Sequence, residues 1–181
     1  MTLLSAQCET DMITYDLEFD YKMHVKLALN VKNSREISER LKSGHLNCAL
    51  IRPHLILDPF QIAVAANKAV YNMKLSNLVT KNINSEIIFN LGITRNISAS
   101  FKDFGIKEDD ENFLVVHVGD EQSAEDVWGQ LECSYVFPSS IKLRDYNDEN
   151  AILKYYKISD VELNASDLLS SVVSRIAVKG I

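Results

Sequence analysis

The stretch DPFQIAVAANKAVYNM, residues 58–73, contains the clearest helix start in this chain. Asp58 can cap a helix, and Pro59 suits the first helical position, where its missing N–H would have no partner. Gln61 stands where a capping box has its second member. The apolar and small residues recur at helical spacing as Ile62, Ala65, Ala66, Ala69 and Met73. This pattern predicts a helix with one packing stripe, whose alanines let another element approach closely.

Strands and helices are predicted on both sides of this stretch. A hairpin or two short strands is predicted over residues 13–29, and strands over 46–51, 113–118 and 135–137. Further helices are predicted over 34–43, 85–91, 97–104, 123–131, 147–158 and 164–178, with Asn33, Asn96 and Asn164 as N-caps. We therefore expect an α+β fold. It is a single-domain two-layer sandwich over residues 13–181, with a mixed, mostly antiparallel sheet, helices packed on it, and a flexible N-terminal arm at 1–12.

The composition restricts the classes of partner. The chain has 181 residues, 46% of them hydrophobic, which fits one folded domain. Its 19 basic and 25 acidic residues give a net charge of −6, so any RNA contact would need a local basic patch. The three cysteines form no CxxC pair, which excludes a zinc ribbon and indicates a reducing compartment. No run approaches the roughly 18 apolar residues of a membrane span.

No motif for catalysis is present. The four histidines form no HExxH pattern, and no P-loop, GxSxG or GxGxxG occurs in a chain with only 6 glycines. We therefore predict no metal, no cofactor and no enzymatic activity. A small-molecule enzyme of another type would need a charged pocket in which a carboxylate and an imidazole converge.

Polar residues are concentrated between residues 58 and 106. They are Asn67, Lys68, Lys81, Arg95 and Lys102. One interpretation is a solvated helical surface; the other is a local basic patch that binds the phosphates of a nucleic acid.

Several blocks of this sequence resemble the TPRKB family. They are residues 58–70, residues 85–91 (SEIIFNL), the segment from Asn96-Ile97-Ser98 to Phe104-Gly105-Ile106, and more loosely YYKIS at 155–159. The spacing between the blocks is also similar, and the resemblance covers residues 20–178, most poorly at 120–145. Together the blocks are specific, whereas each alone is weak.

The resemblance implies a non-catalytic subunit of the KEOPS (EKC) complex, which places threonylcarbamoyl on the adenosine beside the anticodon of certain tRNAs. Such a subunit would bind the small atypical kinase of the complex directly and the other subunits through it. It would help to recruit the 3′ CCA end of tRNA, with weak binding alone, in the cytoplasm and nucleus. The alternative is a general protein-interaction module that regulates a kinase without RNA contact.

The resemblance also implies which residues contact the partners. The kinase would meet Ile97, Phe101 and Phe104 on one helix and Val172, Val173 and Ile176 on the last one. Apolar stripes usually belong to a core, but two adjacent stripes exceed what one small core needs, which favours an interface. The tRNA would meet the five polar residues named above, with cations on phosphates.

Overall fold

A computed structural model describes residues 6–8 and 11–179, with side chains from residue 11 onward. The strands are β1 (Ala6–Cys8), β2 (Ile13–Asp16), β3 (Lys22–Leu29), β4 (Ala49–Ile51), β5 (Phe113–Val118) and β6 (Ser134–Val136). The α-helices are α1 (Ser34–Lys42), α2 (Pro59–Lys74), α3 (Ile83–Leu91), α4 (Ile97–Phe104), α5 (Glu121–Trp128), α6 (Ser140–Leu143), α7 (Glu149–Tyr156), α8 (Asp160–Leu163) and α9 (Leu168–Val178). Two 3-10 turns, η1 (Glu18–Asp20) and η2 (Pro53–Leu55), complete the described elements.

The strands form one sheet in the order β1-β2-β3-β5-β4. Each pairing in the described residues is antiparallel, and His24 of β3 lies opposite His117 of β5. β2 pairs with residues 22–25 of β3, and β6 pairs with residues 27–29. Since β5 occupies the other side of β3, the strands β2 and β6 share one edge of the central strand.

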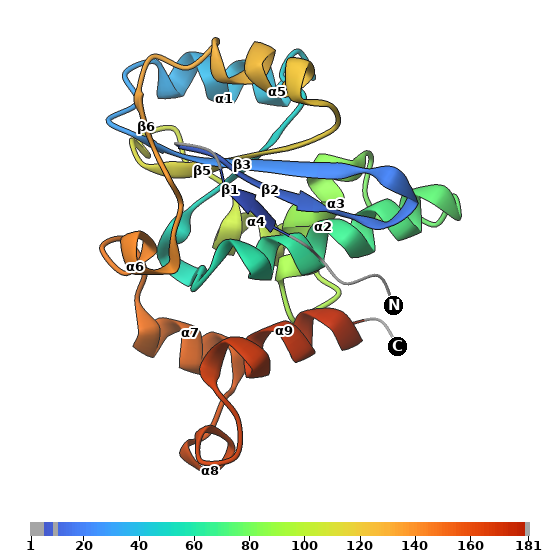
Figure 1. Ribbon diagram of the computed structural model, residues 1–181, viewed down its shortest axis with the longest axis vertical. Helices are drawn as coiled ribbons and strands as arrows, with labels where there is room; N and C mark the ends of the chain where they lie inside the picture. The colour runs from blue at the N-terminus through green and yellow to red at the C-terminus, as the bar shows by residue number, and fades with distance from the viewer. Residues whose placement is uncertain (1–5, 9–10, 180–181) are drawn as a thin grey trace.

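Helices cover both faces of this sheet (Figure 1). Val25 and Leu27 of β3 point into the larger core under α2 and α3, whereas Ala28 joins Phe113 and Val115 in a smaller core under α1 and α5. All six residues of β5 are buried, so neither face of the sheet meets water along this strand. The α+β class, with helices packed on an antiparallel sheet, is confirmed. The second helical face adds a layer to the two that the sequence predicted.

Asp58 and Pro59 start α2 as predicted, but Gln61 accepts from the Leu57 N–H and not from the Asp58 N–H that a capping box uses. Asp58 Oδ1 accepts a hydrogen bond from the Phe60 N–H at 2.8 Å, and Pro59 is the first residue of α2. Gln61 is buried and joins three segments: its Oε1 accepts from Leu57 N–H, and its Nε2 donates to Leu55 O and to the Tyr156 hydroxyl. Gln61 therefore ties α2 to α7 as well as to its own N-terminus.

One predicted cap is right only in position, and another is wrong. Asn33 is the N-cap residue of α1 but makes no side-chain cap bond; its side-chain amide donates to Gln130 O and accepts from Glu132 N–H, which joins α1 to the segment after α5. The last helix starts at Leu168, because Asp167 accepts from Ser170 N–H at 2.9 Å and residues 160–163 form the separate helix α8. Asn164 therefore ends a helix where it was expected to begin one.

The predicted N-terminal arm, residues 1–12, lies mostly outside the described residues. Within it, β1 pairs with β2. Across the described part of the chain, every helix is too short or too polar to cross a membrane. The same residues contain no cluster of histidine, cysteine and acidic side chains that could hold a metal ion.

Candidate functional site

Helix α4 divides its apolar residues between the core and the surface. Asn96 Oδ1 caps it by accepting from Ala99 N–H at 3.0 Å. Gly105 follows its last turn, where a Cβ would lie 2.7 Å from the Phe101 carbonyl oxygen. Phe104 is fully buried, while Ile97 and Phe101 are 38% and 37% exposed. Because residues four apart share a helix face, Ile97 and Phe101 form a small apolar strip at the surface.

Helix α9 packs along α2 and faces mostly inward. Val172 and Ile176 are fully buried in the larger core, and Val173 is half-buried. Phe104, Val172 and Ile176 thus belong to the core of the chain, which corrects their assignment as accessible partner contacts. The physical reason is that the side of α2 away from the sheet is apolar and needs a cover, which α9 supplies.

A hollow of about 620 Å³ opens beside α4, and we call it the α4 groove. Its lining is apolar at Leu46, Cys48, Leu50, Ile88, Phe101 and Ile106, and polar at Lys42, Lys81, Asn47, Asn82 and Asn84 among others. Asn84 Nδ2 donates to Asn47 Oδ1 at 2.8 Å, which links α3 to the segment before β4. Within the described part of the chain, no Asp, Glu or His lines this groove, although the chain is acidic overall.

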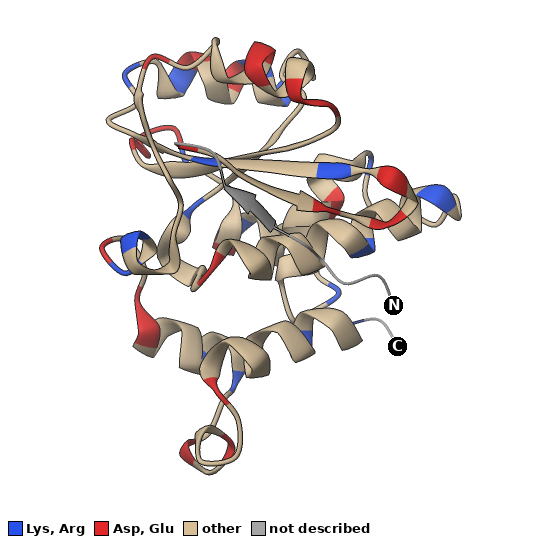
Figure 2. Ribbon diagram, in the orientation of Figure 1, with Lys and Arg blue, Asp and Glu red and all other residues tan. Residues whose placement is uncertain are grey.

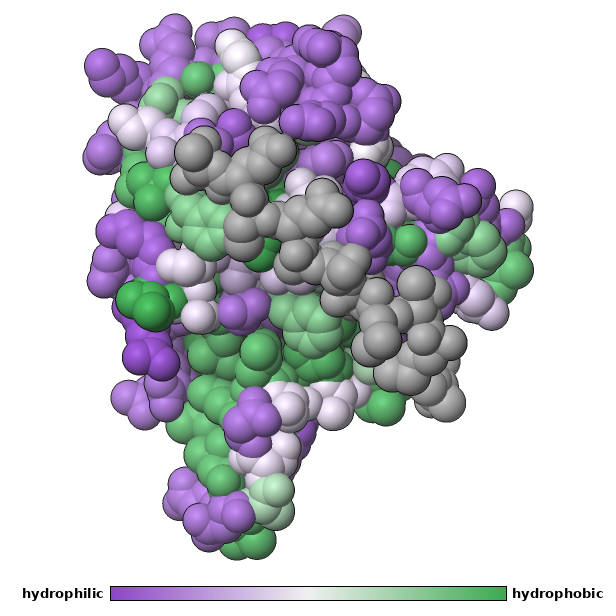
Figure 3. All heavy atoms as spheres, in the orientation of Figure 1, coloured by the Kyte–Doolittle hydropathy of each residue, from purple (hydrophilic) through white to green (hydrophobic). Residues whose placement is uncertain are grey.

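A second apolar area lies over α6, α7 and α8 and was not predicted from the sequence. Figure 3 shows apolar side chains gathered on this face of the molecule. Ile141 of α6 is 76% exposed and Val161 of α8 is 79% exposed. Both helices are four residues long, too short for a periodic pattern to reveal which side chains they expose.

The five predicted RNA contacts do not form one patch. Asn67 Oδ1 accepts from Glu18 N–H at 2.8 Å and so fixes the η1 turn. Lys81 lines the α4 groove, and Lys102 is exposed on α4. Lys68 and Arg95 line one hollow together.

Lys68 has a structural partner at the end of α9. Its Nζ donates to Ile176 O at 3.3 Å, to Ala177 O at 3.0 Å and to Lys179 O. A lysine near a helix C-terminus satisfies the last carbonyl groups and interacts favourably with the helix dipole. Burial lowers the pKa of Lys68, and the nearby Glu86 carboxylate raises it in part.

Lys68 and Arg95 meet further cations in two adjoining hollows, of about 300 and 520 Å³, that share Arg95 and Lys179. We call them together the basic hollow. Its lining residues are Lys68, Asn72, Asn77, Val79, Phe89, Asn90, Arg95 and Lys179 in the smaller part, with Ile93, Tyr156, Lys157, Arg175 and Val178 in the larger. Neither lining contains an acidic residue. Figure 2 shows acidic residues on α5, on the opposite side of the sheet from α9, and also on α8.

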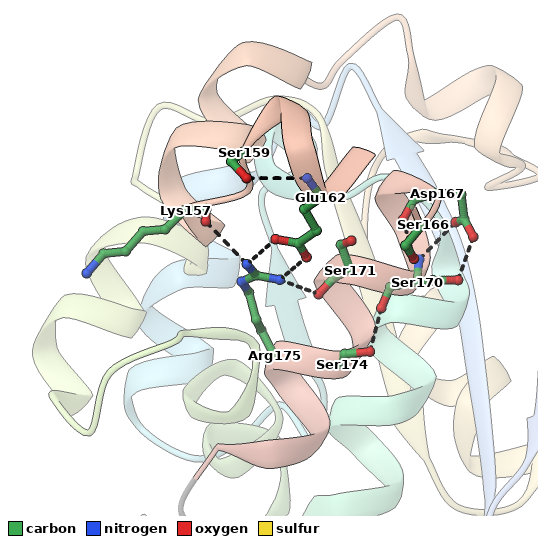
Figure 4. Close-up of polar contacts among 9 residues, drawn as sticks. All are labelled: Lys157, Ser159, Glu162, Ser166, Asp167, Ser170, Ser171, Ser174 and Arg175. Atoms are coloured by element: carbon green, nitrogen blue, oxygen red, sulfur yellow. Dashed lines mark hydrogen bonds and ion pairs between the residues drawn. The ribbon is translucent and has the colours of Figure 1, made fainter. Parts of the chain in front are cut away.

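The cations of the larger part differ in how they are engaged. Arg175 forms an ion pair with Glu162 at 2.6 Å and also donates to the carbonyl oxygens of Ser171 and Lys157. The hydrogen bonds from Arg175 lower the pKa of Glu162 to about 2. Figure 4 shows Arg175 enclosed by these partners, whereas the side chain of Lys157 extends away from them. Lys157 and Arg95 are both exposed, so their charges reach the solvent.

The sequence reasoning missed Lys157, Arg175 and Lys179. All three belong to the C-terminal elements, which were interpreted for their apolar pattern alone. A signal was nevertheless present, since Lys157, Arg175 and Lys179 are the basic residues at the ends of the two predicted C-terminal helices.

Comparison with known proteins identifies the family. Residues 29–180 match the model of the family described as "Kinase binding protein CGI-121". The chain belongs to the CGI-121 family. It is 36% identical to the EKC/KEOPS complex subunit TPRKB of Danio rerio over 174 residues, which covers 93% of this chain and 98% of that protein. It is 29% identical to the EKC/KEOPS complex subunit CGI121 of Candida glabrata over 168 residues, covering 90% and 95% of the two chains. The predicted membership of the TPRKB family is confirmed, and this CGI-121 chain is therefore a KEOPS-type subunit.

Proposed function

We propose that this chain is a non-catalytic subunit that binds the small atypical kinase of its complex through α4 and thereby supports threonylcarbamoyl modification of tRNA. The observation that carries the kinase part is the apolar strip of Ile97 and Phe101, exposed at the edge of the α4 groove. Membership of a family of kinase-binding proteins agrees with it.

The α4 groove has the composition of an interface centre. Buried apolar side chains form its floor, Phe101 lies at its edge, and lysines and asparagines surround it. Interfaces commonly combine an apolar centre with a polar rim, and a few aromatic anchors supply most of the binding free energy. Val173 of α9 remains a half-buried candidate contact.

Gel filtration of the chain mixed with its kinase tests this proposal. We expect the wild-type pair to co-elute and Phe101→Glu to elute separately, because the contact would bury an unpaired charge. Ile141→Glu is the matched control, since it places the same charge on the exposed apolar area over α6 to α8. If Ile141→Glu separates the pair and Phe101→Glu does not, the proposed kinase contact on α4 is wrong, and the kinase binds the apolar area over α6 to α8.

We further propose that the chain helps to recruit the 3′ CCA end of tRNA. The basic hollow supports this, because it concentrates cations in a protein of net charge −6. Weak binding by the isolated chain is expected for the same net charge. Filter binding of intact tRNA and of tRNA trimmed of CCA, each at two salt concentrations, should show tighter, salt-sensitive binding of the intact form. Equal binding of both tRNAs would reject the CCA contact.

The non-catalytic part of the proposal is supported by the lining of the hollows. Neither the α4 groove nor the basic hollow has an acidic residue or a histidine among its lining residues, so no carboxylate and imidazole converge there. His24 and His117 are instead buried in the sheet, where each ring contacts neighbouring polar groups. Measuring turnover by the isolated chain on nucleotide and tRNA substrates tests this part, and any saturable activity would contradict it.

The second candidate function is kinase regulation without RNA contact. The ion pair and backbone contacts of Arg175 favour it, since they give part of the basic hollow a purely structural role. The tRNA titration separates the two candidates. We also propose that the chain works in the cytoplasm and the nucleus, which imaging of a fluorescent fusion would test.

A further inference from the structure

The carbonyl groups at the end of α4 are bound by one residue outside the helix. The last four carbonyl groups of an α-helix have no partner within it. In α4 the first of these, Phe101 O, accepts from Gly105 N–H at 2.9 Å, and the last, Phe104 O, accepts from Arg52 N–H at 2.8 Å. The Arg52 guanidinium group binds the two between them and the next carbonyl, donating to Lys102 O, to Asp103 O at 2.9 Å and to Gly105 O at 2.8 Å. Arg52 thus satisfies four consecutive carbonyl groups at this helix end.

Arg52 is itself fixed by the elements around it. It follows β4, and Ile51, the last residue of that strand, forms an antiparallel bridge with Gly105. The Arg52 side chain is 15% exposed, and its Nε lies 3.8 Å from Oδ2 of Asp110. The same Asp110 oxygen accepts from Lys107 N–H at 2.7 Å, which closes the turn after α4. A planar guanidinium group with five donors can bind several fixed acceptors at once, and its charge complements the negative end of the helix dipole. Arg52 therefore joins the end of α4 to β4 and to the turn at residues 107–110.

Helix α4 depends on such support because it is short. It has 8 residues, whereas isolated helices of fewer than roughly 12–15 residues are marginal in water. Its first turn is capped separately by Asn96. The other ion pair of the turn at residues 107–110 joins Glu108 to Lys42, and its side chains are 55% and 64% exposed, so it contributes little. Arg52 is therefore the residue that we expect to keep the last turn of α4 ordered.

We infer that Arg52 is a positioning residue for the proposed partner contact: by fixing the last turn of α4, it holds Phe101 in place before the partner binds. Phe101 belongs to that turn and is 37% exposed, whereas Ile97 belongs to the first turn. Arg52 is not one of the described residues that line the α4 groove, so it acts through the helix and not by contact. A side chain that is already in place avoids the entropic cost of being ordered on binding.

This role rests on the proposed kinase contact through α4 and differs from a purely structural one in what it predicts. A structural role means that substitutions of Arg52 change the stability of the chain alone. A positioning role means in addition that Arg52 and Phe101 are energetically coupled in binding, because the first acts through the second. Arg52 and Ile97 should not be coupled, since they support different turns of the helix.

The first experiment measures the order of the last turn in the full-length chain alone. Hydrogen exchange at the amides of residues 102–105 should be about tenfold faster in Arg52→Met than in wild type, and exchange in β5 should be unchanged. Arg52→Lys should lie between the two, because an ammonium group keeps the charge but lacks the fork of donors. Arg40→Met is the matched control: it removes an arginine that pairs with Glu36 on α1 and should leave α4 as in wild type. Unchanged exchange at the end of α4 in Arg52→Met would overturn the inference.

The second experiment measures the coupling in the complex with the kinase by isothermal titration calorimetry. Arg52→Met should weaken binding about tenfold, Arg52→Lys should recover part of the loss, and Arg40→Met should bind as wild type. The fold loss caused by Phe101→Ala should be at least fivefold smaller in the Arg52→Met background than in the wild-type background, because a ring that is not held in place contributes less. Ile97→Ala should cause the same fold loss in both backgrounds, since its turn is capped by Asn96.

Two results of the second experiment would overturn the positioning role. One is that the losses caused by Arg52→Met and Phe101→Ala multiply in the double variant, which would mean that Arg52 only stabilises the fold. The other is wild-type affinity of Arg52→Met although hydrogen exchange shows a loosened last turn. Thermal unfolding checks that each variant is folded, and Arg52→Lys replaces Arg52→Met in the cycle if the latter does not fold. If instead Phe101→Glu leaves the pair with the kinase intact, the proposed contact itself fails, and hydrogen exchange still decides whether Arg52 orders the end of α4.

Discussion

Helices α4 and α9 carry similar apolar patterns but contribute differently to the molecule. Helix α4 has three large apolar residues at helical spacing, and α9 has the same spacing in Leu169, Val172, Val173 and Ile176. In α9, Val172 and Ile176 are fully buried, whereas α4 buries Phe104 and leaves Ile97 and Phe101 more than a third exposed. Helix α9 lies along α2 and buries one face against the larger core, while α4 lies beside an open groove. A periodic pattern therefore predicts that a helix has an apolar face, and the position of the helix decides how much of that face another chain can reach.

The largest expected effect is a difference in stability between substitutions of two phenylalanines of α4. Phe104→Glu should abolish cooperative folding, because it removes a buried ring and places a carboxylate in the core, at a cost of about 4 kcal/mol or more. Phe101→Glu should change the free energy of unfolding by less than about 1 kcal/mol, because the site is exposed. Urea denaturation followed by circular dichroism measures both. Similar stabilities for the two variants would contradict the division of α4 into a core side and a surface side.

A second pair makes the same comparison on α9. Ile176→Ala should lower the free energy of unfolding by about 3 kcal/mol, since it leaves a cavity in the larger core. Val173→Ala should cost about 1 kcal/mol, because Val173 is only half-buried. Denaturation curves of the two variants test the order. If Val173→Ala were as damaging as Ile176→Ala, the inward face of α9 would differ from the one described.

The sequence predicted the fold class and most helices because local rules governed them. Asp58 with Pro59 and Asn96 with Gly105 mark real helix ends, since each cap bonds within its own turn. Asn33 has the predicted N-cap position but makes no cap bond, because its amide reaches residues about 100 positions away, which no local rule includes. The start of the last helix failed for a different reason: the capping residue is Asp167, three residues after the polar residue that was chosen.

The candidate sites were less predictable than the fold. Lys68 and Arg95 were selected from the sequence and do line one hollow, but the third cation, Lys179, comes from the far end of the chain. Lys68 also bonds the end of α9, a contact across more than 100 residues. Apolar periodicity could not predict that Val172 is buried and Phe101 partly exposed, because the burial of each residue depends on which element packs against its helix. Residue type indicated which side chains could bind a phosphate or an apolar partner, whereas tertiary packing determined which of them lie together.

A third prediction concerns the contact that holds α9 in place. Lys68→Met should lower the free energy of unfolding by about 1.5 kcal/mol, because the last carbonyl groups of α9 lose a charged donor. Lys154→Met is the matched control: Lys154 is exposed on α7, and the substitution removes the same charge. Hydrogen exchange should locate the effect by faster exchange in α9. Equal protection of α9 in both variants would mean that Lys68 does not anchor the helix.

The smallest expected effect is a pH dependence that arises at the end of α9 and has no counterpart in α4. The pKa of Lys179 is about 8 in the folded chain and 10.5 in the unfolded one. Between these pH values the unfolded chain binds more protons than the folded chain, so the free energy of unfolding should rise as the pH rises from 8 toward 10.5. Below about pH 8, Lys179 is protonated in both states and should not contribute to a pH dependence. The value of about 8 already includes the charge of Glu86, which offsets part of the burial. Burial raises the pKa of Cys48 to about 12, which gives the opposite trend, so the measure is the difference between wild type and Lys179→Met in urea denaturation from pH 7.5 to 9.5. We expect the wild type to gain stability relative to the variant as the pH rises. Parallel curves would show that the Lys179 ammonium group is not held in the hollow.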